Sequence, residues 1–215
     1  MYVSINRGGS PPTFDYIGKV RDAESYANQE RVRLGDIDGD GRIDYCAIKD
    51  EGDIYCWRNG GIGDIPVWQG MVGGAVTFDA KGMGDIQGIR FADINGDFRS
   101  DFILMFPDGH SRIFINQRGT TDDGSGLKPH WVEASKAHAG FGGVANMGLD
   151  NFKLGRVYGS GRADYVRVTE SNTQDGTGWK HTYNFEIYKN TGSGGRKVKG
   201  VSIFLDSFSL TKAAY

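Results

Sequence analysis

Four aspartates fall within nine residues of this chain, in residues 36–44, which read DIDGDGRID. Carboxylates this close repel one another unless water or a cation offsets their charge. The spacing of two places Asp36, Asp38 and Asp40 around one tight turn, and the intervening glycines allow the positive φ angles that such a turn needs. Calcium takes about six to eight oxygens from carboxylates, backbone carbonyls and water. The stretch therefore predicts a calcium site formed by these three side chains, Asp44 and the Arg42 carbonyl; the alternative is a solvated acidic turn.

The nine-residue pattern returns in residues 93–101 and 156–164, so its starts lie 57 and 63 residues apart. Each copy follows a short apolar run and precedes two strand-like runs, the second of which closes on an asparagine. These closing asparagines are Asn59, Asn116 and Asn190. Self-similarity with a period of this size predicts a repeat architecture.

The strand-like runs are short, rich in β-branched and aromatic residues, and bounded by Gly, Asp and Asn. They cover residues 45–48 and 54–58, then 102–106 and 112–115, then 165–169 and 183–189. A fourth strand per repeat is expected near Trp68 and Trp131, with looser counterparts at Phe14 and Ile203. No apolar stripe of helical period is sustained, and residues 21–31 fit either a short helix or a loop. We therefore predict an all-β protein, a β-propeller built from four-stranded antiparallel blades.

The predicted organisation is a single domain over residues 1–215. It comprises a partial blade (about 1–29) and three complete blades (about 30–86, 87–149 and 150–215). Three complete blades and one partial blade are few for a closed propeller ring, so three ways of completing the ring remain open. The first strand could complete the last blade, two chains could pair as a homodimer, or a longer parent chain could supply the remainder. An open blade edge favours some form of closure.

Composition limits the classes of partner. The 34 glycines and 38% hydrophobic residues fit a turn-rich all-β domain. The net charge of −2 gives no reason to expect nucleic-acid binding. The sequence has no run of about 18 apolar residues, so no membrane span is expected.

Cys46 and Cys56 lie at nearly opposite positions on the two strands of one predicted hairpin. The matching positions in the other repeats are apolar, so both sulfur atoms should point into the packing between blades. This arrangement favours a disulfide and hence a secreted or extracellular protein. The alternative is a pair of buried free thiols.

The acidic nonapeptide, its preceding apolar strand, the paired strands after it and the closing Asn59-Gly60-Gly61 together resemble the FG-GAP/VCBS repeat. That repeat builds calcium-binding β-propellers of secreted proteins, including the integrin α head and fungal lectins. The resemblance implies structural calcium in two loops. The first-loop ligands would be Asp36, Asp38, Asp40, Asp44 and the Arg42 carbonyl, and the second-loop ligands Asp93, Asn95, Asp97, Asp101 and the Arg99 carbonyl.

Two departures from the repeat are visible. Phe98 stands in the second loop where the family usually has glycine. The third loop keeps only Ser160 and Asp164, and Arg156 replaces its first carboxylate. No calcium is expected in the third loop, where a fixed guanidinium could offset charge instead.

No catalytic constellation is recognisable, because the four histidines share no metal-ligand spacing and no nucleophile-elbow motif occurs. We therefore expect a lectin-like binding module for carbohydrate or an extracellular protein, alone or appended to a secreted enzyme. The polar insertion at residues 170–181 carries Trp179, Asn172 and Asp175, which suit sugar stacking and hydrogen bonding; Trp179 could equally cover a blade edge. A structural or assembly domain without a small ligand is the alternative, and a secreted hydrolase ranks third.

Overall fold

The computed structural model describes residues 1–61, 67–117, 129–134, 148–175, 178–190 and 210–211. Its strands pair only in the antiparallel sense within these ranges. Helical structure there is limited to three short 3-10 turns, η1 (Gln29–Arg31), η2 (Ile86–Gly88) and η3 (Leu149–Asn151). None of these helical segments is long or apolar enough to cross a bilayer. The all-β prediction is confirmed, and the part of residues 21–31 before η1 is a loop.

Three sheets built on four consecutive strands follow one another along the chain. The first contains β3 (Val32–Gly35), β4 (Asp44–Ile48), β5 (Asp53–Asn59) and β6 (Trp68–Gly70), and the short β7 (Phe78–Asp79) also pairs with β5. The second contains β8 (Ile89–Ala92), β9 (Asp101–Met105), β10 (Ser111–Asn116) and β11 (Trp131–Glu133). The third contains β12 (Phe152–Gly155), β13 (Asp164–Asp175), β14 (Gly178–Tyr188) and β15 (Leu210–Thr211).

The strand order follows the repeat pattern closely. In each sheet an acidic loop joins the first strand to the second, and a hairpin joins the second to the third. The expected fourth strands at Trp68 and Trp131 are β6 and β11, whereas Ile203 lies outside the described residues. Each sheet therefore has the four-stranded antiparallel composition of a propeller blade.

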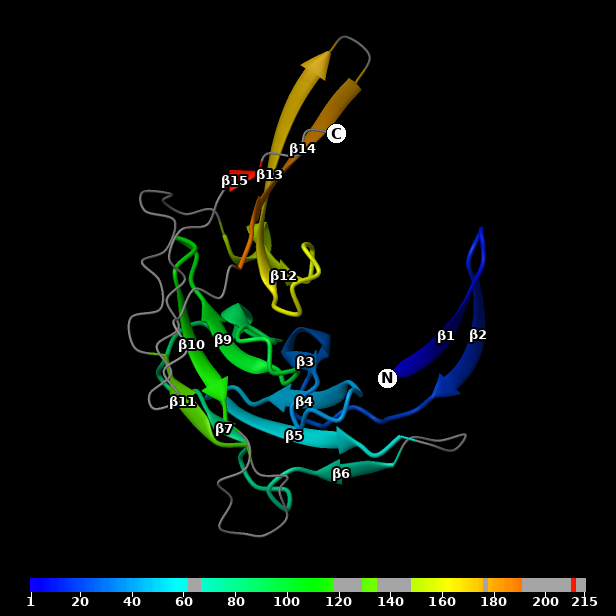
Figure 1. The fold of residues 1–215 in the computed structure, drawn as a ribbon, viewed down its shortest axis with the longest axis vertical. Helices are drawn as coiled ribbons and strands as arrows, with labels where there is room; N and C mark the ends of the chain where they lie inside the picture. Colours follow the sequence, from blue (N-terminus) through cyan, green and yellow to red (C-terminus); the bar gives the residue numbers. More distant parts are fainter. Residues whose placement is uncertain (62–66, 118–128, 135–147, 176–177, 191–209, 212–215) are drawn as a thin grey trace.

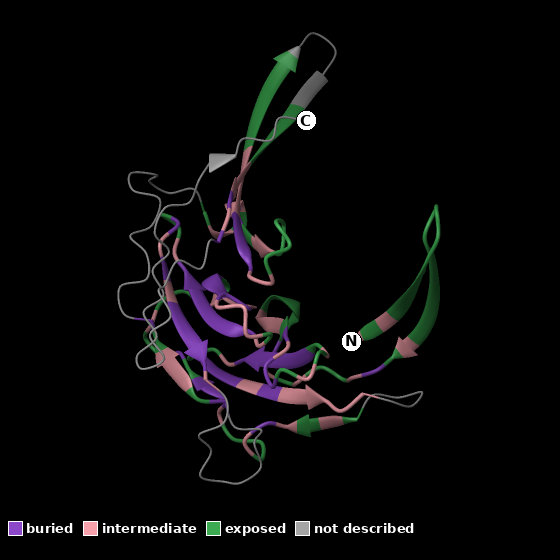
Figure 2. Cartoon of the chain, viewed as in Figure 1, coloured by how far each residue is buried: buried purple, intermediate pink, exposed green. Residues whose placement is uncertain are grey.

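The three sheets are arranged around one side of a common centre (Figure 1). The first strands β3 and β12 lie toward that centre, and the described residues form an arc that is open on the opposite side (Figure 1). The first strand of the second sheet, β8, contacts β3. Buried residues concentrate in the first two sheets and at the base of the third, whereas residues 170–174 of β13 and 181–185 of β14 are exposed (Figure 2).

Two apolar cores fill the spaces between successive sheets. The first joins Cys46, Ile48, Ile54 and Cys56 of the first sheet to Phe102, Leu104 and Phe114 of the second. The second joins Ile103, Met105, Ile113 and Ile115 of the second sheet to Phe152, Tyr165 and Tyr188 of the third. Because side chains alternate along a strand, each sheet has a forward face toward the following sheet and a back face toward the preceding one.

A matching pair of tryptophans fixes the segment that precedes each of the first two sheets. The indole of Trp131 donates to the Thr77 carbonyl, 3.0 Å away, and Phe78 then packs against the Trp131 ring. The indole of Trp68 likewise donates to the Val20 carbonyl at 2.9 Å, but the next residue is Arg21. The Arg21 guanidinium takes the place of the phenyl ring.

Arg21 lies over an aromatic face on the back of the first sheet. Its Cζ is 4.4 Å from the Tyr45 ring centroid and 4.3 Å from that of Trp57. Glu24 accepts a hydrogen bond from Arg21 Nη2 at 2.5 Å. A cation held between π faces and paired with a carboxylate can replace an aromatic ring without leaving an unpaired buried charge.

The amino-terminal strands do not complete the last blade. β1 (Tyr2–Gly8) pairs with β2 (Thr13–Lys19) in a separate two-stranded sheet, which projects from the arc beside the first sheet (Figure 1). Phe14, the expected counterpart of the fourth-strand tryptophans, lies in β2 and is exposed. Of the three ways of closing the ring, completion of the last blade by the first strand is therefore wrong.

Candidate metal centre

The first acidic loop is organised by Asp36. Its Oδ1 accepts the backbone N–H groups of Gly39 and Asp40 at 2.8 and 3.1 Å, and its Oδ2 accepts that of Gly41 at 2.9 Å. Gly39 and Gly41 have φ angles of 77° and 86°, which glycine adopts without a steric penalty. The aspartate side chain and the two glycines thus close the turn that brings the next carboxylates together.

Three carboxylates converge in this loop. One oxygen from each of Asp36, Asp38 and Asp40 lies within 4.8 Å of the others. Asp38 is almost fully buried, and its Oδ2 is 2.5 Å from Arg58 Nε. Asp40 Oδ2 pairs with Arg58 Nη2 at 3.0 Å and with Arg42 Nη2 at 2.6 Å. Arg58 lies outside the nine-residue motif, just before the closing Asn59, so the motif alone does not single it out.

The charges of the loop do not balance. Asp36, Asp38, Asp40 and Asp44 carry four negative charges when ionised, against two positive charges on Arg42 and Arg58. Burial raises the pKa of Asp36, and the neighbouring carboxylates of Asp38 and Asp40 raise it further, against its backbone hydrogen bonds. Burial also raises the pKa of Asp40, but the Arg42 backbone hydrogen bond and Arg58 outweigh it, so the pKa is lowered. A dication would neutralise the two remaining charges, so the donor set and the net charge both fit calcium.

Asp44 lies outside the group of three converging carboxylates. Its Oδ2 accepts the N–H of Ile37 at 2.8 Å and its Oδ1 accepts that of Asn59 at 2.8 Å. Burial raises the pKa of Asp44 to about 6 despite these bonds. In this structure Asp44 therefore connects the acidic loop to the closing asparagine, and its predicted role as a calcium ligand stays a prediction.

The last aspartate makes the same connection in the other loops. Asp101 Oδ2 accepts the Ile94 N–H at 2.8 Å and Asp101 Oδ1 accepts the Asn116 N–H at 2.9 Å. Asp164 accepts the N–H groups of Val157 and Asn190 at 2.9 and 2.8 Å. Burial raises the pKa of Asp101 to about 7. Because the connection persists where most other acidic residues are gone, it does not require a metal.

The second loop repeats the geometry of the first with less unbalanced charge. Asp93 accepts the N–H groups of Gly96 and Phe98, at 2.7 and 3.0 Å. Asn95 Nδ2 donates to Asp97 Oδ2 at 3.0 Å, and Arg99 Nη2 pairs with the same oxygen at 2.8 Å. Phe98 adopts a φ of 70°, so it keeps the glycine-like backbone of the turn and exposes its ring.

Arg156 neutralises the second loop rather than its own. Its Nη2 lies 3.2 Å from Asp93 Oδ2. The three carboxylates of Asp93, Asp97 and Asp101 then face the two guanidiniums of Arg99 and Arg156, which leaves one negative charge. The first loop therefore demands a dication more strongly than the second.

Arg42 and Arg99 were predicted to supply carbonyl ligands. Their guanidinium Nε atoms donate to the carbonyls of Asn59 and Asn116, at 2.9 and 3.2 Å. These bonds hold each loop against the end of its own third strand. The role of the two backbone carbonyls toward a metal stays a prediction.

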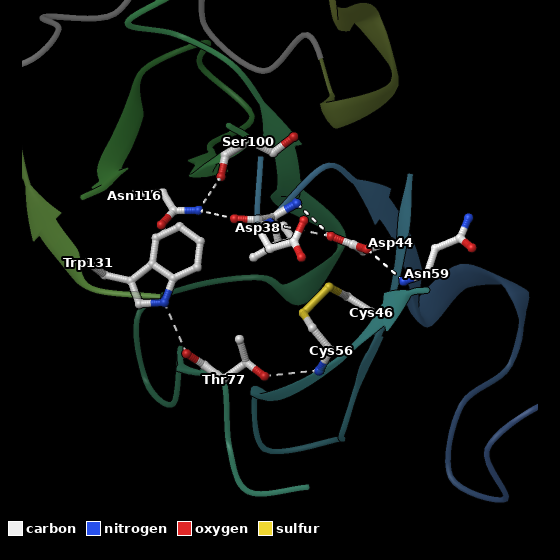
Figure 3. The surroundings of a disulfide bond; sticks show 10 residues. Asp38, Asp44, Cys46, Cys56, Asn59, Thr77, Ser100, Asn116 and Trp131 are labelled. Carbon is white, nitrogen blue, oxygen red and sulfur yellow. Dashed lines mark hydrogen bonds between the residues drawn. A yellow bond between two sulfur atoms is a disulfide. The ribbon is translucent and has the colours of Figure 1, made fainter. Parts of the chain in front are cut away.

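The cysteine prediction is confirmed. Cys46 and Cys56 are directly opposite in the β4–β5 pair and form a disulfide that is buried against the second sheet (Figure 3). The matching cross-strand pairs are Ile103 with Ile113 and Val166 with Ile187. Thr77 Oγ1 accepts the Cys56 N–H at 3.0 Å, which ties the disulfide strand to the segment before β7 (Figure 3).

The acidic loops border an open hollow of about 750 Å³ at the centre of the arc. Its lining combines the carboxylates of Asp36, Asp40, Asp93 and Asp97 with the apolar side chains of Leu34, Ile43, Phe91, Phe98 and Leu154. The carboxylates in this lining are the same candidate calcium ligands that the two loops contain, so the hollow adds no separate group of charged residues.

The proposed ligand residues at 170–181 lie in a strand hairpin rather than in a loop. β13 and β14 continue past the predicted ends at Thr169 and Tyr183, with Asn172 paired to His181 and Gln174 to Trp179. Asn172 is exposed, and the side chains of Asp175 and Trp179 lie outside the described part of the structure. The structure therefore places the predicted residues on one ribbon, which projects away from the first two sheets (Figure 1).

Comparison with known proteins gives one positive result. Neither the curated proteins nor the solved structures include a significant match to the chain. Residues 36–104 match the family model described as the FG-GAP-like repeat. The matched range takes in the disulfide-bonded hairpin and the first two acidic loops. The match agrees with the resemblance to this repeat that the sequence pattern indicates.

Proposed function

We propose that the protein is a calcium-stabilised extracellular binding module, without catalytic activity of its own. The observation that carries the calcium part is the convergence of Asp36, Asp38 and Asp40 in a loop with two unbalanced negative charges. The FG-GAP-like repeat supports a binding domain of extracellular type. The buried disulfide supports an oxidising compartment.

Calcium would be held by Asp36, Asp38 and Asp40 in the first loop, and by Asp93, Asn95 and Asp97 in the second. The bound ion would supply two positive charges to a turn that already has its backbone shape. Its role is structural, because the loop joins two strands of one sheet and its oxygens are partly committed to backbone donors. Binding to the folded state alone stabilises that state by mass action.

Chelation tests the metal directly. At a free calcium concentration of about 100 times Kd, linkage contributes about 2.7 kcal/mol to the free energy of unfolding. For a chain of this size that corresponds to a melting temperature about 5–11 °C higher in calcium than in EDTA. An unchanged melting temperature, together with no calcium by elemental analysis, would sink the proposal.

A matched pair of variants locates the ion. The double variant Asp36→Asn with Asp38→Asn should lose most of the calcium-dependent shift in melting temperature. Asp22→Asn, at an exposed position outside the loop, should keep it. Loss of the shift in the control, or its retention in the loop variant, would place the ion elsewhere.

The binding surface that we propose is the β13–β14 ribbon. Cross-strand register places Val168 beside Phe185, Glu170 beside Tyr183, and Asn172 beside His181, all on one face. Tyr183 and Phe185 are each about half exposed. The described side chains of this face combine the rings of Tyr183 and Phe185 with the Asn172 amide and the Glu170 carboxylate. Trp179 lies two residues before His181 in the same strand. Such a face suits stacking on a sugar ring or docking of an extracellular protein.

A glycan array with the intact chain distinguishes these ligands. We expect binding of a glycan that is lost in Trp179→Ala and Tyr183→Ala but kept in Thr182→Ala, which alters the opposite face of the ribbon. Absence of glycan binding, or binding that ignores the two aromatic variants, would contradict the carbohydrate part. A structural role without a small ligand would then be favoured.

A further inference from the structure

The second sheet is locked onto the first by contacts between their acidic loops. Ser100 donates its N–H to the Asp36 carbonyl at 2.6 Å, and Asn116 Nδ2 donates to the Ile37 carbonyl at 2.7 Å. The Arg99 side chain covers Gly39, where an added Cβ would lie 2.6 Å from Arg99 Cγ. At this junction the second repeat donates two hydrogen bonds to backbone carbonyls of the first loop, and one of its side chains packs on a glycine of that loop.

The third sheet is locked onto the second in the same way. Ala163 donates its N–H to the Asp93 carbonyl at 2.6 Å, and Asn190 Nδ2 donates to the Ile94 carbonyl at 2.9 Å. The Arg162 side chain covers Gly96, where an added Cβ would lie 3.2 Å from Arg162 Cγ. Two consecutive junctions therefore use the same three contacts at the same loop positions, although the third loop has lost most of its acidic residues.

This regularity leaves one set of donors without a partner at the start of the array. Ile43 occupies the position of Ser100 and Ala163, but its exposed fraction is 52%, against 7% and 5% for those residues. Asn59 keeps the bond from its Nδ2 to the carbonyl within its own loop, at 3.2 Å. Within the described residues, nothing accepts the Ile43 N–H or a second bond from Asn59 Nδ2.

The matching acceptors are exposed at the other end of the array. Val157 occupies the position of Ile37 and Ile94, but its exposed fraction is 50%, against 1% and 3% for those residues. No described donor reaches the carbonyls of Arg156 and Val157. Gly159, the counterpart of the two covered glycines, has no atom within 4 Å of where a Cβ would be.

We propose that these two ends bind each other between two copies of the chain, in a head-to-tail junction. The donor end, defined by Arg42, Ile43 and Asn59, would meet the acceptor end of the second copy, defined by Arg156, Val157 and Gly159. The occupant is a second copy because one chain carries both halves of a contact that it already forms twice internally. The donor end of each copy would meet the acceptor end of the other, so two such junctions close the pair.

The sheet faces next to these ends continue the same interface. At the internal junctions, the cross-strand pairs Cys46–Cys56 and Ile103–Ile113 pack against the next sheet. The third sheet presents the equivalent pair, Val166 and Ile187, which is only partly buried. Two copies would bring six blades, three from each chain, around one centre, within the four to eight blades of known propellers. Closure of the ring limits the assembly to a dimer, because a head-to-tail contact that does not close would extend into a filament.

The first experiment measures the mass of the intact chain in solution by analytical ultracentrifugation, with calcium in excess. We expect twice the mass of one chain. Ile43→Lys and Val157→Lys each place a charge at one end of the array, at a position exposed enough to accept it. Each variant should be a folded monomer that still unfolds in one cooperative transition. A monomeric parent chain, or a dimer that persists in the double variant, overturns the proposal.

Mixing the two variants separates a head-to-tail junction from any other dimer. Ile43→Lys keeps an intact acceptor end and Val157→Lys keeps an intact donor end, so the mixture should form a heterodimer through one junction. The double variant mixed with either single variant retains no matching pair of intact ends, so it should not associate and serves as the negative control. No association in the mixture of single variants contradicts the proposal.

A second pair of variants covers the case in which a lysine variant does not fold. Asn59→Ala removes a donor at the free end, whereas Asn116→Ala removes its counterpart at an internal junction. The former should weaken dimerisation and leave the monomer folded; the latter should lower the melting temperature. Gly159→Asn adds a side chain that tolerates positive φ at the acceptor end, where it should block docking. Normal dimerisation of both Asn59→Ala and Gly159→Asn would refute the assignment of the two ends.

Discussion

Replacement of the disulfide by the residues of the third repeat isolates the contribution of the cross-link. The double variant Cys46→Val with Cys56→Ile reproduces the cross-strand pair Val166–Ile187. Both cysteines are buried in the first core, so apolar replacements retain most of the packing there. The variant therefore removes the covalent bond and leaves the pattern of side chains that the fold already uses elsewhere.

The magnitude follows from the length of chain between the cysteines. They are 10 residues apart in sequence, and restricting a loop of that size in the unfolded chain is worth about 3 kcal/mol. For a chain of this size, a loss of about 3 kcal/mol lowers the melting temperature by about 6–12 °C. Because the cost is assigned to the unfolded state, reduction of the native protein should give the same loss as the double variant.

The assay is urea unfolding of the native chain with and without reductant, beside the double variant, with thiols counted before each titration. We expect the reduced chain and the variant to unfold at the same lower urea concentration. A native chain whose stability does not change on full reduction would refute the reasoning. A variant far less stable than the reduced chain would show instead that packing around the two positions, and not the cross-link, carries the stability.

Three further outcomes follow from the loops. Gly41→Ala should lower the free energy of unfolding by about 1 kcal/mol, because Gly41 has a left-handed backbone. Gly39→Ala should lower it by about 2 kcal/mol or more, because the added Cβ would also collide with the Arg99 side chain. Equal losses of the two variants in urea titrations would contradict the contact between Gly39 and Arg99. Asp164→Ala should cost about 2–4 kcal/mol by leaving backbone N–H groups without their acceptor, and the loss should be the same in calcium and in EDTA; a calcium-dependent loss would argue against a purely structural role. Calcium affinity, measured by titration calorimetry, should decrease as the pH is lowered from about 7.5 to about 5. Because the pKa of Asp36 is raised, a proton competes with the ion for this carboxylate at a higher pH than it would for an ordinary aspartate. An affinity that does not change over this range would contradict Asp36 as a ligand.

The repeat spacing was enough to predict the sheets, because each acidic loop lies between two short strands whose ends are marked by polar residues. The same alignment paired Cys46 with Cys56, since both fall at positions that are apolar in the other repeats. Those predictions rest on local chain geometry. A turn motif, and the alternation of apolar and polar residues along a strand, can both be recognised in the sequence without knowing which residues pack against them.

The remaining features depend on partners that are distant in sequence. Arg58 reaches Asp38 from β5. Its counterparts before the closing asparagines are Ile115 and Lys189, so the repeat alignment alone does not reveal this ion pair. Residues 170–174 are exposed, so their strand lacks the apolar alternation that would have extended the prediction beyond Thr169. Arg156 was expected to offset charge in its own loop, but its guanidinium reaches Asp93, 63 residues earlier.

The three loops separate the shape of the turn from the charge that it holds. Backbone donors meet the last aspartate in every loop, so the turn keeps its form in the third loop after its first carboxylate has become Arg156. That arginine pairs with Asp93 and so lowers the demand for a cation in the second loop as well. The unbalanced negative charge is therefore greatest in the first loop and smaller in the second. The third loop, which keeps only Asp164 of the four acidic positions, has none. Calcium would stabilise a scaffold whose blades already interlock through backbone carbonyls, asparagines and arginines, and for this reason repeats can lose the ion without losing the fold.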